Sequence, residues 1–576
     1  MTFYPNGVFK PPSPMRRMGS MPMMFDEGHF MQMSPQHQML FIPPQPQQAQ
    51  PQAPPPPQPA VPQVVLRSTL AHVAPDDDET VAKIAANNKW HLDVGATQTH
   101  FDTLDMSGVS LTVLPAPLFT GLFANITNLY LGSNKLSTFP AGLLQMTQLQ
   151  CLHLEKNQLK TLPPEIHRLR ELRELDVSGN ELVELPRELG HLYKLWSLEF
   201  ANNSVELLPS DVACRDTRGV VRYLLDQCPP PAPPAERRQW RSENACVPGG
   251  GPVLRVMTYN ILAKLYCTEH MYPYCPTKAL DADYRRSLAL EQVFEYNADI
   301  VCLQEVDSKQ FCEIDAAMRA RGYDSYFEKK TRPLRKPQDD GSLIDGCATF
   351  WKTAKIALLD KSIHAYQALS QQRFGKYAES QSGVRLLCSK EHIAVATVFE
   401  TKTPVPRRFA LSNTHIFWDP AYEYVKLMQA QIQIEELLAL QRQYTADAAH
   451  PLPLIITGDY NSTPDSGVYE LFSTGRLSPD HPHWHNTDFG KYTREGIHNP
   501  QRFASAYAAH GEPEYTNCAA DFCGTLDYIW TTPESVRPVQ VLDVIPMSKL
   551  GLLLRPFPNT YFPSDHVPLV ADLQLV

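Results

Sequence analysis

The most regular hydrophobic pattern along the chain is a leucine repeat in its first half. The spacing Leu-x-x-Leu-x-Leu-x-x-Asn-x-Leu begins at residue 149 and recurs, with Ile, Val or Phe at some positions, from residues 126, 172 and 195. The asparagines of the four copies are 23 residues apart, which is typical of leucine-rich repeats. They are Asn134, Asn157, Asn180 and Asn203.

The repeat predicts one short strand per copy, with the leucines stacked inside a solenoid and each asparagine satisfying backbone groups of a turn. Leu104, Met106 and Val109 fit a degenerate first repeat, and residues 78–100 are expected to form a helical cap, so the domain would span 78–227. The strand face of such a solenoid usually binds another protein. The alternative is that this face only supports the rest of the chain. The outward positions on this face are Tyr130, His153, Glu155, Asp176, Ser178 and Glu199.

The second half of the chain, residues 253–576, alternates strand and helix patterns and predicts one large α/β domain. Helical apolar spacing covers 283–297, 308–321 and 422–443. The short apolar or β-branched runs that predict strands are VLRVMTYNIL, DIVCLQEV, GCATFWK, HIAVATVFE, RFALSNTHI, PLIITGDYN, TLDYIW and HVPLVADLQLV.

Two further segments separate or precede these domains. Residues 1–66 hold sixteen prolines, ten glutamines and nine methionines but only five charged residues, so they are expected to be disordered. Residues 228–252 combine PPPAPPAERRQW with three glycines and are interpreted as a linker. Arg237, Arg238 and Arg241 in this linker are expected to be solvated, with RNA contact as the alternative.

Composition and charge narrow the class of protein. No run of 18 apolar residues and no signal-peptide pattern occurs, so the chain is expected to be intracellular and outside membranes. The twelve cysteines include no CxxC pair and no Cys/His group at the spacing of a zinc site. They are expected to be reduced thiols without an obligate disulfide partner. A net charge of −10 argues against bulk coating of nucleic acid, so any such contact must be local.

Candidate chemistry is concentrated at the ends of the predicted strands. These side chains are Asn260, Glu305, His415, Asp459, Asn461, Asp527, Asp565 and His566. Each alone has an ordinary explanation: Glu305 as a strand-end charge, Asp459 and Asn461 as a turn, and Asp565 beside His566 as a chance pair. Carboxylates at the tips of several buried strands, however, are the arrangement expected of an active site.

The motifs MTYNIL, CLQEV, NTHIFWDP, GDYNSTP, GTLDYIW and PSDH occur in this order over about 310 residues. Together they resemble the exonuclease-endonuclease-phosphatase superfamily of magnesium-dependent phosphodiester hydrolases. With leucine-rich repeats and a Pro/Gln-rich tail before them, the chain is similar to the carbon catabolite repressor-type poly(A) deadenylases. The resemblance implies a two-layer β-sandwich flanked by helices and a 3′→5′ exoribonuclease that shortens mRNA tails and releases 5′-AMP.

The resemblance also implies roles for individual residues. Glu305 matches the metal-binding glutamate, with Asn260 as a ligand or phosphate contact, and Asp459 places or deprotonates the attacking water. Asn461 and His415 match phosphate contacts, and Asp527 is oriented against His566 with Asp565 in support. Pro420 and Phe522 match the positions between which an adenine stacks.

The residue types agree with this chemistry. Carboxylate and amide oxygens, which Glu305, Asp459, Asn461 and Asp527 offer, suit one or two Mg²⁺ ions, with Mn²⁺ possible, and such ions supply the fixed charge that phosphodiester cleavage needs. A basic run between Lys329 and Lys336 is a candidate RNA contact or a solvated loop.

The resemblance implies that the repeats dock a DEDD-type deadenylase subunit and, through it, a large scaffold subunit, in the cytoplasm and also the nucleus. Two alternatives remain from the sequence. One is another phosphodiesterase or phosphatase of the superfamily, such as a DNA repair endonuclease or an inositol or lipid phosphatase. The other is a non-catalytic RNA-binding scaffold.

Overall fold

The computed structural model describes residues 83, 84, 87, 102–114, 125–204, 206, 208–242, 246, 250–332, 341–445 and 450–576. The expected disordered tail, residues 1–66, and most of the expected cap, residues 78–100, lie outside the described residues. Within them, no helix is both long and apolar enough to cross a bilayer.

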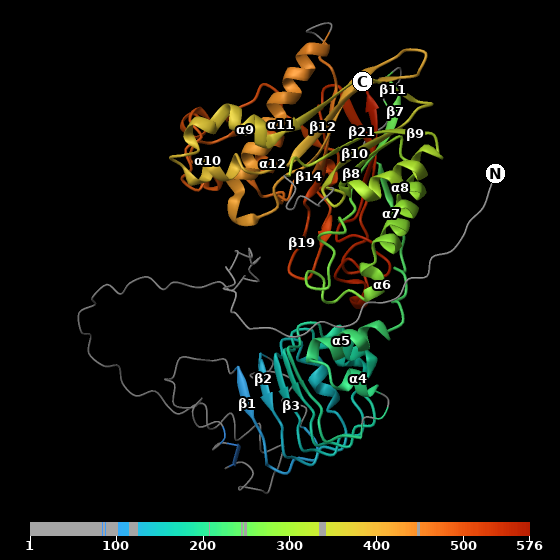
Figure 1. Cartoon of the computed structure of the whole chain (residues 1–576), viewed down its shortest axis with the longest axis vertical. Helices are drawn as coiled ribbons and strands as arrows, with labels where there is room; N and C mark the ends of the chain where they lie inside the picture. The colour runs from blue at the N-terminus through green and yellow to red at the C-terminus, as the bar shows by residue number, and fades with distance from the viewer. Residues whose placement is uncertain are drawn as a thin grey trace, which may run out of the picture. The chain divides into compact units, whose positions relative to one another are not determined.

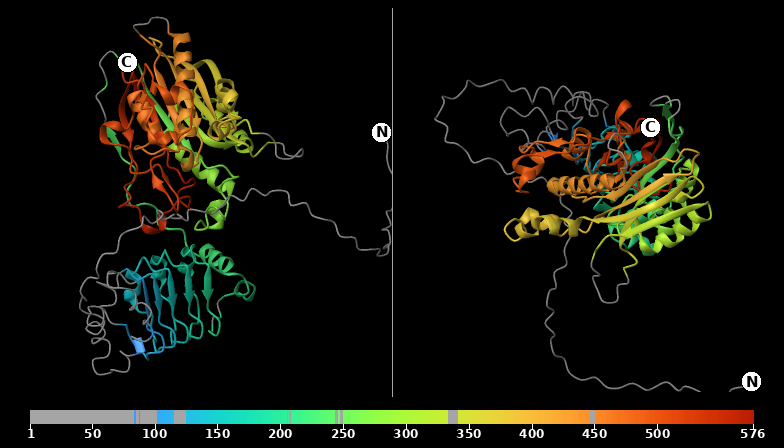
Figure 2. Two further views of the ribbon diagram at one scale, coloured as in Figure 1. Left: turned by 90° about the vertical axis from the view of Figure 1, so that its left-hand side faces the viewer. Right: turned by 90° about the horizontal axis from the view of Figure 1, so that it is seen from above.

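The leucine repeats form a solenoid whose strands pair in parallel, in the order of the chain (Figure 2). The strands are β1 (Thr103–Asp105), β2 (Asn128–Tyr130), β3 (Cys151–His153), β4 (Glu174–Asp176) and β5 (Ser197–Glu199). Short 3-10 helices follow three of them, at Ala141–Gln145, Pro164–Arg168 and Arg187–His191. Helices α4 (Ser210–Ala213) and α5 (Thr217–Asp226) close the series, and Asp216 caps α5 by accepting from Gly219 N.

Each repeat asparagine bonds backbone groups of its own turn and of the preceding repeat, as the pattern predicted. Asn157 Nδ2 donates to Leu131 O at 3.0 Å and to Leu154 O at 3.1 Å, and its Oδ1 accepts from Leu136 N at 3.0 Å. Asn134 and Asn180 make equivalent bonds. These asparagines are buried, so the ladder satisfies backbone groups that no water reaches.

The second half of the chain is a two-layer β-sandwich flanked by helices, which confirms the predicted fold class. One sheet has the order β6-β21-β22-β7-β8-β10-β9 and the other the order β11-β12-β13-β14-β20-β17. The first consists of β6 (Trp240–Ser242), β21 (Val536–Leu542), β22 (Leu569–Leu575), β7 (Val253–Asn260), β8 (Ile300–Asp307), β10 (Asp345–Lys352) and β9 (Tyr323–Lys329). The second consists of β11 (Ile356–Ala365), β12 (Ile393–Thr401), β13 (Arg408–His415), β14 (Leu454–Asp459), β20 (Asp527–Thr531) and β17 (Ala504–Ser505).

Helices cover both outer faces of the sandwich (Figure 1). Helices α7 (Ala282–Tyr296) and α8 (Ser308–Arg319) pack on the first sheet, through a core that includes Val293, Ile314 and Met318. The second sheet carries α9 (Tyr366–Phe374), α10 (Ser382–Leu387), α11 (Glu423–Tyr444) and α12 (Gly467–Thr474). Other short elements are α6 (Thr277–Leu280), α13 (Lys491–Arg494), the antiparallel pair of β15 (Arg476–Leu477) with β16 (Ile497–His498), and the hairpin of β18 (Asn517–Cys518) with β19 (Cys523–Gly524).

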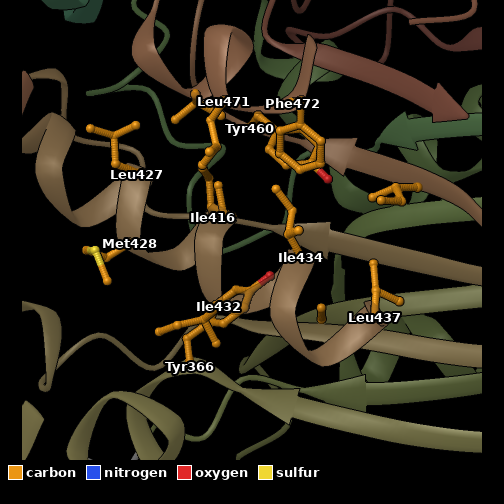
Figure 3. Close-up of a cluster of buried hydrophobic side chains, with 14 of the residues drawn as sticks. Tyr366, Ile416, Leu427, Met428, Ile432, Ile434, Leu437, Tyr460, Leu471 and Phe472 are labelled. Carbon is orange, nitrogen blue, oxygen red and sulfur yellow. The ribbon is translucent and has the colours of Figure 1, made fainter. Parts of the chain in front are cut away.

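Helix α11 is buried on almost every side, which explains why it also carries buried glutamines. Figure 3 shows its Ile434 near Tyr460 and Phe472 and its Ile432 near Tyr366. Gln433 Nε2 donates to Ser412 Oγ at 2.9 Å, and Tyr460 OH donates to Gln433 Oε1 at 3.0 Å. These bonds tie the helix to β13 and to the loop that follows β14.

The expected linker, residues 228–252, contains a strand that the sequence did not predict. Residues 240–242 form β6 and pair with β21. Arg238, expected to be solvated, instead donates to Asp543 O at 2.7 Å, Pro568 O at 2.7 Å and Leu542 O at 3.1 Å, and Arg241 pairs with Asp543. The sequence did not predict this strand for two reasons. The segment around it is rich in proline, and a strand of three residues is too short to show an alternating pattern.

Replacing Asn157 by alanine should destabilise the solenoid by about 3 kcal/mol, because several buried backbone groups would lose their partners at once. Hydrogen–deuterium exchange of strands β2–β4 in the full chain measures this loss as faster exchange. The matched control is Asn203→Ala, which removes the last, partly buried step of the same ladder and should cost less. Equal exchange in both variants and the parent would contradict the ladder's role.

Candidate active site

A β-bulge in β8 reorients the side chain of Glu305 toward the other predicted active-site residues. Gln304 and Glu305 in β8 lie opposite the single residue Cys347 in β10, and Glu305 has φ +56°. A left-handed glutamate is uncommon and marks a strand that has been re-aimed. The carboxylate accepts from Asn260 Nδ2 at 3.0 Å through Oε1 and from Ala263 N at 2.9 Å through Oε2.

Asp459 brings the second sheet to the same point. Asn260 Nδ2, at the end of β7, also donates to Asp459 Oδ2 at 2.9 Å, so a single amide joins the carboxylates of the two sheets. Asp459 ends β14, beside His415 in β13 and opposite Asp527 in β20. Gly458 permits this close packing, because a Cβ there would lie 2.1 Å from Thr414 O.

His566 lies between two of the carboxylates. Its Nδ1 is 2.7 Å from Asp527 Oδ2, and its Nε2 is 3.5 Å from Asp459 Oδ2. Burial by itself would lower the pKa of His566, but the charges of Asp527, Asp459 and Asp565 outweigh burial and raise it well above its usual value. The ring is therefore an imidazolium at neutral pH.

His415 is the opposite case and is neutral at neutral pH. Burial lowers its pKa to about 4, and the Lys330 ammonium adds to the effect. Asn461 Nδ2 lies 3.0 Å from His415 Nε2 and donates to it, which places the ring proton on Nδ1, 3.9 Å from Glu305 Oε1. Asn461 N in turn donates to Asp459 Oδ1 at 2.9 Å.

A buried ion pair lies near Glu305 and was missed in the sequence. Lys330 Nζ is 2.6 Å from Asp345 Oδ2, both are almost fully buried, and Tyr266 OH donates to Asp345 Oδ1 at 3.0 Å. The expectation that Lys330 belongs to an exposed basic run is therefore wrong, while Arg335 and Lys336 of that run lie outside the described residues. Nothing adjacent to Lys330 or Asp345 in the sequence signals the pairing.

Burial raises the pKa of Glu305 to about 7, and the Asp345 carboxylate adds to the rise, while Lys330 opposes it. A buried carboxylate of this kind is ionised readily only when a cation reaches it.

The other predicted residues lie around this buried cluster. Asp565 accepts from Tyr272 OH at 3.0 Å and from Asn517 Nδ2 at 3.1 Å, so it acts on His566 through its charge while Asp527 makes the bond to the ring. Pro420 begins an exposed 3-10 helix (Pro420–Tyr422), and Phe522 lies in the turn between β18 and β19 with 39% of its surface exposed.

Several supporting residues carry no recognisable sequence signal. Lys426 Nζ donates to Asn461 O at 2.8 Å, and Gln429 Oε1 accepts from Phe417 N at 2.8 Å, so α11 fixes the loops after β14 and β13. Ser564 Oγ donates to Asn260 O at 2.7 Å. Their long-range partners are set by the fold, which explains why local patterns did not find them.

The cluster has the donor set of a divalent-cation site. Asp459 and Asp527 present carboxylate oxygens within 4.8 Å of each other beside His566, and Asp527 Oδ1 is buried with no hydrogen-bond partner among the described residues. Carboxylate and amide oxygens dominate, as a hard cation such as Mg²⁺ prefers. The residues therefore fit a bound cation.

Four of the predicted partner-binding residues on the solenoid lie in one row across its strands, while Glu155 and Ser178 follow β3 and β4. Tyr130, His153, Asp176 and Glu199 are register partners in successive strands. The rings of Tyr130 and His153 meet edge to face at 4.9 Å, and His153 Nδ1 is 3.9 Å from Glu155 Oε2. Asp176 Oδ1 accepts from Ser178 N at 2.8 Å.

Residues 257–566 match the profile of the Endonuclease/Exonuclease/phosphatase family, and residues 171–192 match that of the Leucine Rich Repeat. The first match covers more than half of the chain, so the protein belongs to the Endonuclease/Exonuclease/phosphatase family.

The particular proteins it is similar to are Ccr4-type subunits. The CCR4-Not complex 3′-5′-exoribonuclease subunit Ccr4 of Candida albicans is 37% identical over 325 residues, which are 56% of this chain and 41% of that protein. The Ccr4 subunit of Mycosarcoma maydis is 31% identical over 387 residues, covering 62% and 57% of the two chains. The chain thus spans about half the length of these curated relatives.

Two solved structures are also similar. The crystal structure of ANGEL2, a 2′,3′-cyclic phosphatase, in complex with adenosine-2′,3′-vanadate has a TM-score of 0.48 and 23% identity, covering 59% of this chain and 99% of that one. The human Nocturnin catalytic domain with bound sulfate has a TM-score of 0.39 and 23% identity, covering 59% and 98%.

Divalent-cation binding should weaken about tenfold between pH 8 and pH 6, because Glu305, with a pKa of about 7, must lose its proton to act as a ligand. Isothermal titration calorimetry with Mn²⁺ measures this change. Glu305→Gln should weaken binding at pH 8 and flatten the pH dependence, whereas Glu295→Gln, an exposed change on α7, should leave both unchanged. A pH-independent affinity would contradict the placement of Glu305 in the cation site.

Proposed function

We propose that this protein is a Mg²⁺-dependent 3′→5′ exoribonuclease that shortens poly(A) tails and releases 5′-AMP. The observation that carries the proposal is the convergence of Asn260, Glu305 and Asp459 from two sheets, with Asp527 and His566 beside them. The similarity to Ccr4 exoribonuclease subunits supports RNA as the substrate.

The residues divide the work of hydrolysis by their protonation states. Asp459 is an acceptor positioned to orient the attacking water and take its proton. His566, charged and held by Asp527, faces the phosphate and stabilises the negative charge that grows on its oxygens. Neutral His415 and Asn461 contact the same phosphate once the Asn461 amide exchanges its bond to His415 Nε2 for one to a phosphate oxygen.

Glu305, Asn260, Asp459 and Asp527 would hold Mg²⁺, or Mn²⁺, which supplies fixed positive charge next to the scissile phosphate. Asn260 fixes the relative positions of Glu305 and Asp459 through its amide. Lys330 partly offsets the repulsion between Glu305 and Asp345, which keeps the glutamate available as a ligand near neutral pH.

Recognition of the tail would depend on local stacking rather than on bulk charge. Pro420, at the start of the 3-10 helix after β13, and Phe522, in the turn between β18 and β19, are exposed, and an adenine between them would gain about 1–3 kcal/mol of stacking energy. The net charge of −10 supports this view, because it gives little general attraction for RNA.

We further propose that the solenoid binds a DEDD-type deadenylase and, through it, a large scaffold subunit, in the cytoplasm and nucleus. The similar proteins are subunits of the CCR4-Not complex, which supports an assembly of this kind. The row of Tyr130, His153, Asp176 and Glu199 offers such a partner one continuous polar and aromatic strip.

Purified protein with Mg²⁺ should shorten a 5′-labelled RNA with a 3′ adenylate run one nucleotide at a time. Glu305→Ala should lower the rate at least about a hundredfold, since it removes a charge on which transition-state stabilisation depends. Gel electrophoresis follows the RNA, and chromatography identifies 5′-AMP.

Parallel reactions with oligo(U), an abasic DNA duplex and inositol phosphates distinguish the superfamily's other substrates, and Glu295→Ala controls for the loss of an exposed glutamate. Full activity in EDTA or in Glu305→Ala would contradict the mechanism. Preference for one of the other substrates would contradict the assignment to poly(A).

Replacing Asp176 and Glu199 by lysine should lower the amount of co-purified deadenylase partner about tenfold or more, because both carboxylates lie on the strand face of the solenoid. Activity on oligo(A) should stay intact, because both residues are far in the sequence from the catalytic motifs. Glu165→Lys, an exposed change in a 3-10 helix of the same solenoid, is the matched control. Undiminished co-purification of the double variant would show that the partner binds elsewhere.

A further inference from the structure

The hairpin of β18 and β19 links the candidate active site to a pair of cysteines. Asn517 in β18 pairs with His566 through an isolated antiparallel bridge, and its Nδ2 donates to Asp565 Oδ2 at 3.1 Å. Phe522, the proposed adenine-stacking residue, immediately precedes Cys523 at the start of β19, which is labelled in Figure 1. The hairpin therefore carries one residue that contacts the buried cluster and one, Phe522, that is exposed and is assigned to the substrate by the proposed function.

Cys518 and Cys523 are direct register partners in this hairpin. The backbone groups of Cys518 bond residues outside the hairpin and not Cys523. The Cys518 N–H donates to Asp565 O at 2.8 Å, and the Cys518 carbonyl accepts from Phe557 N at 2.7 Å. The bond that closes the hairpin is the next one, from Ala519 N to Phe522 O at 2.8 Å. The two cysteines thus form a non-hydrogen-bonded pair, in which Cα atoms are about 4.5 Å apart and the side chains are adjacent.

This spacing suits a disulfide, whose Cα atoms are usually about 4.4–6.8 Å apart. Both thiols are free in the structure. A bond between them would need little movement of the backbone, because the partners already face each other across the narrow pair.

The two thiols differ in a way that favours stepwise oxidation. Cys523 is exposed, whereas Cys518 is buried with 3% of its surface accessible. The hydrogen bond from Cys518 lowers the pKa of Cys523, the Arg555 guanidinium adds to this effect, and burial opposes it. The same bond raises the pKa of Cys518. Cys523 is therefore the accessible nucleophile, and Cys518 is the thiol placed to react with it afterwards.

We propose that Cys518 and Cys523 form a reversible disulfide when the protein meets a hydroperoxide, and that this bond weakens adenylate binding at Phe522. The sulfur of Cys523 attacks one peroxide oxygen and becomes a sulfenic acid, and the other oxygen leaves as water. The sulfur of Cys518 then displaces the hydroxyl group, which leaves as water with the Cys518 proton. One hydrogen peroxide thus oxidises two thiols to one disulfide and yields two waters, and a dithiol reductant reverses the change.

The effect on binding follows from the position of Phe522, and it rests on the proposed function. The Phe522 ring already lies over the hairpin, because its Cζ is 2.9 Å from where a Cβ on Gly524 would stand. Closing the adjacent cysteines into a ring would hold the turn and this folded-back side chain in place, which hinders stacking on a base. The contacts of the hairpin with the buried cluster are the Asn517 bridge to His566, the Asn517 amide bond to Asp565 and the backbone bond from Cys518 to Asp565. A disulfide between two side chains that already face each other leaves these contacts in place, so the effect should be on KM rather than on kcat.

Thiol oxidation is measured directly and without reference to nuclease activity. Treatment with hydrogen peroxide, followed by alkylation and digestion, should yield the tryptic peptide 503–549, which holds these two cysteines and no other, unalkylated and lighter by two hydrogen atoms. Dithiothreitol should restore alkylation of both thiols. Two alkylated thiols after peroxide, or a sulfinic or sulfonic acid on Cys523 without the bond, would overturn the proposal.

Steady-state kinetics on oligo(A) test the consequence. Oxidation should raise KM about fivefold, reversibly, and leave kcat within about twofold, a change consistent with partial loss of one stacking contact. Cys523→Ser, an exposed substitution, should abolish the response, and Cys312→Ser, an exposed cysteine on α8, should retain it. A disulfide that forms without changing KM would overturn the coupling to Phe522. If no nuclease activity is found at all, the proposed function fails while the thiol assay still decides whether the disulfide forms.

Discussion

The active-site geometry depends on one amide group that bonds a carboxylate from each sheet. Asn260 Nδ2 donates to Glu305 in the first sheet and to Asp459 in the second sheet. All three side chains are buried. Buried like charges repel and are costly to desolvate, so they persist only where donors, protons or cations offset them. Here the hydrogen-bond donors are Asn260, Ala263 N and Asn461 N, and the positively charged side chains are His566 and Lys330. A divalent cation would neutralise the negative charge that these groups leave uncompensated.

The same constraint explains the opposite protonation states of the two histidines. His566 contacts two aspartates and remains charged, whereas His415 lies in a buried position closer to Lys330 and is neutral. Two identical side chains thus provide a charged group and a neutral donor within one site. Backbone distortion supports the arrangement, because the left-handed Glu305 lies at the bulge within β8 and the left-handed Asn461 lies in the loop that follows β14.

Much of the fold and most of the candidate site could be predicted from the sequence because the signals were local. Strands β7, β8, β13 and β14 contain short apolar or β-branched runs, and the polar residues at or near their ends identified the site. The edge strands β9 and β11, and β21 next to the short edge strand β6, were missed since most of their residues are only partly buried and they lack such runs. The Lys330–Asp345 pair, the bulge at Glu305 and the contact between Cys518 and Cys523 depend on register between strands, which no single segment encodes.

A crystal structure of the protein with Mn²⁺ and a short oligoadenylate, with the metal located by its anomalous signal, tests the central claim most directly. The account predicts a manganese ion within about 2.0–2.4 Å of a Glu305 oxygen, with the terminal phosphate between His566 and Asn461. A manganese ion bound only at other positions, with Glu305 still bonded solely to Asn260 and Ala263 and the phosphate outside the cluster, would contradict it.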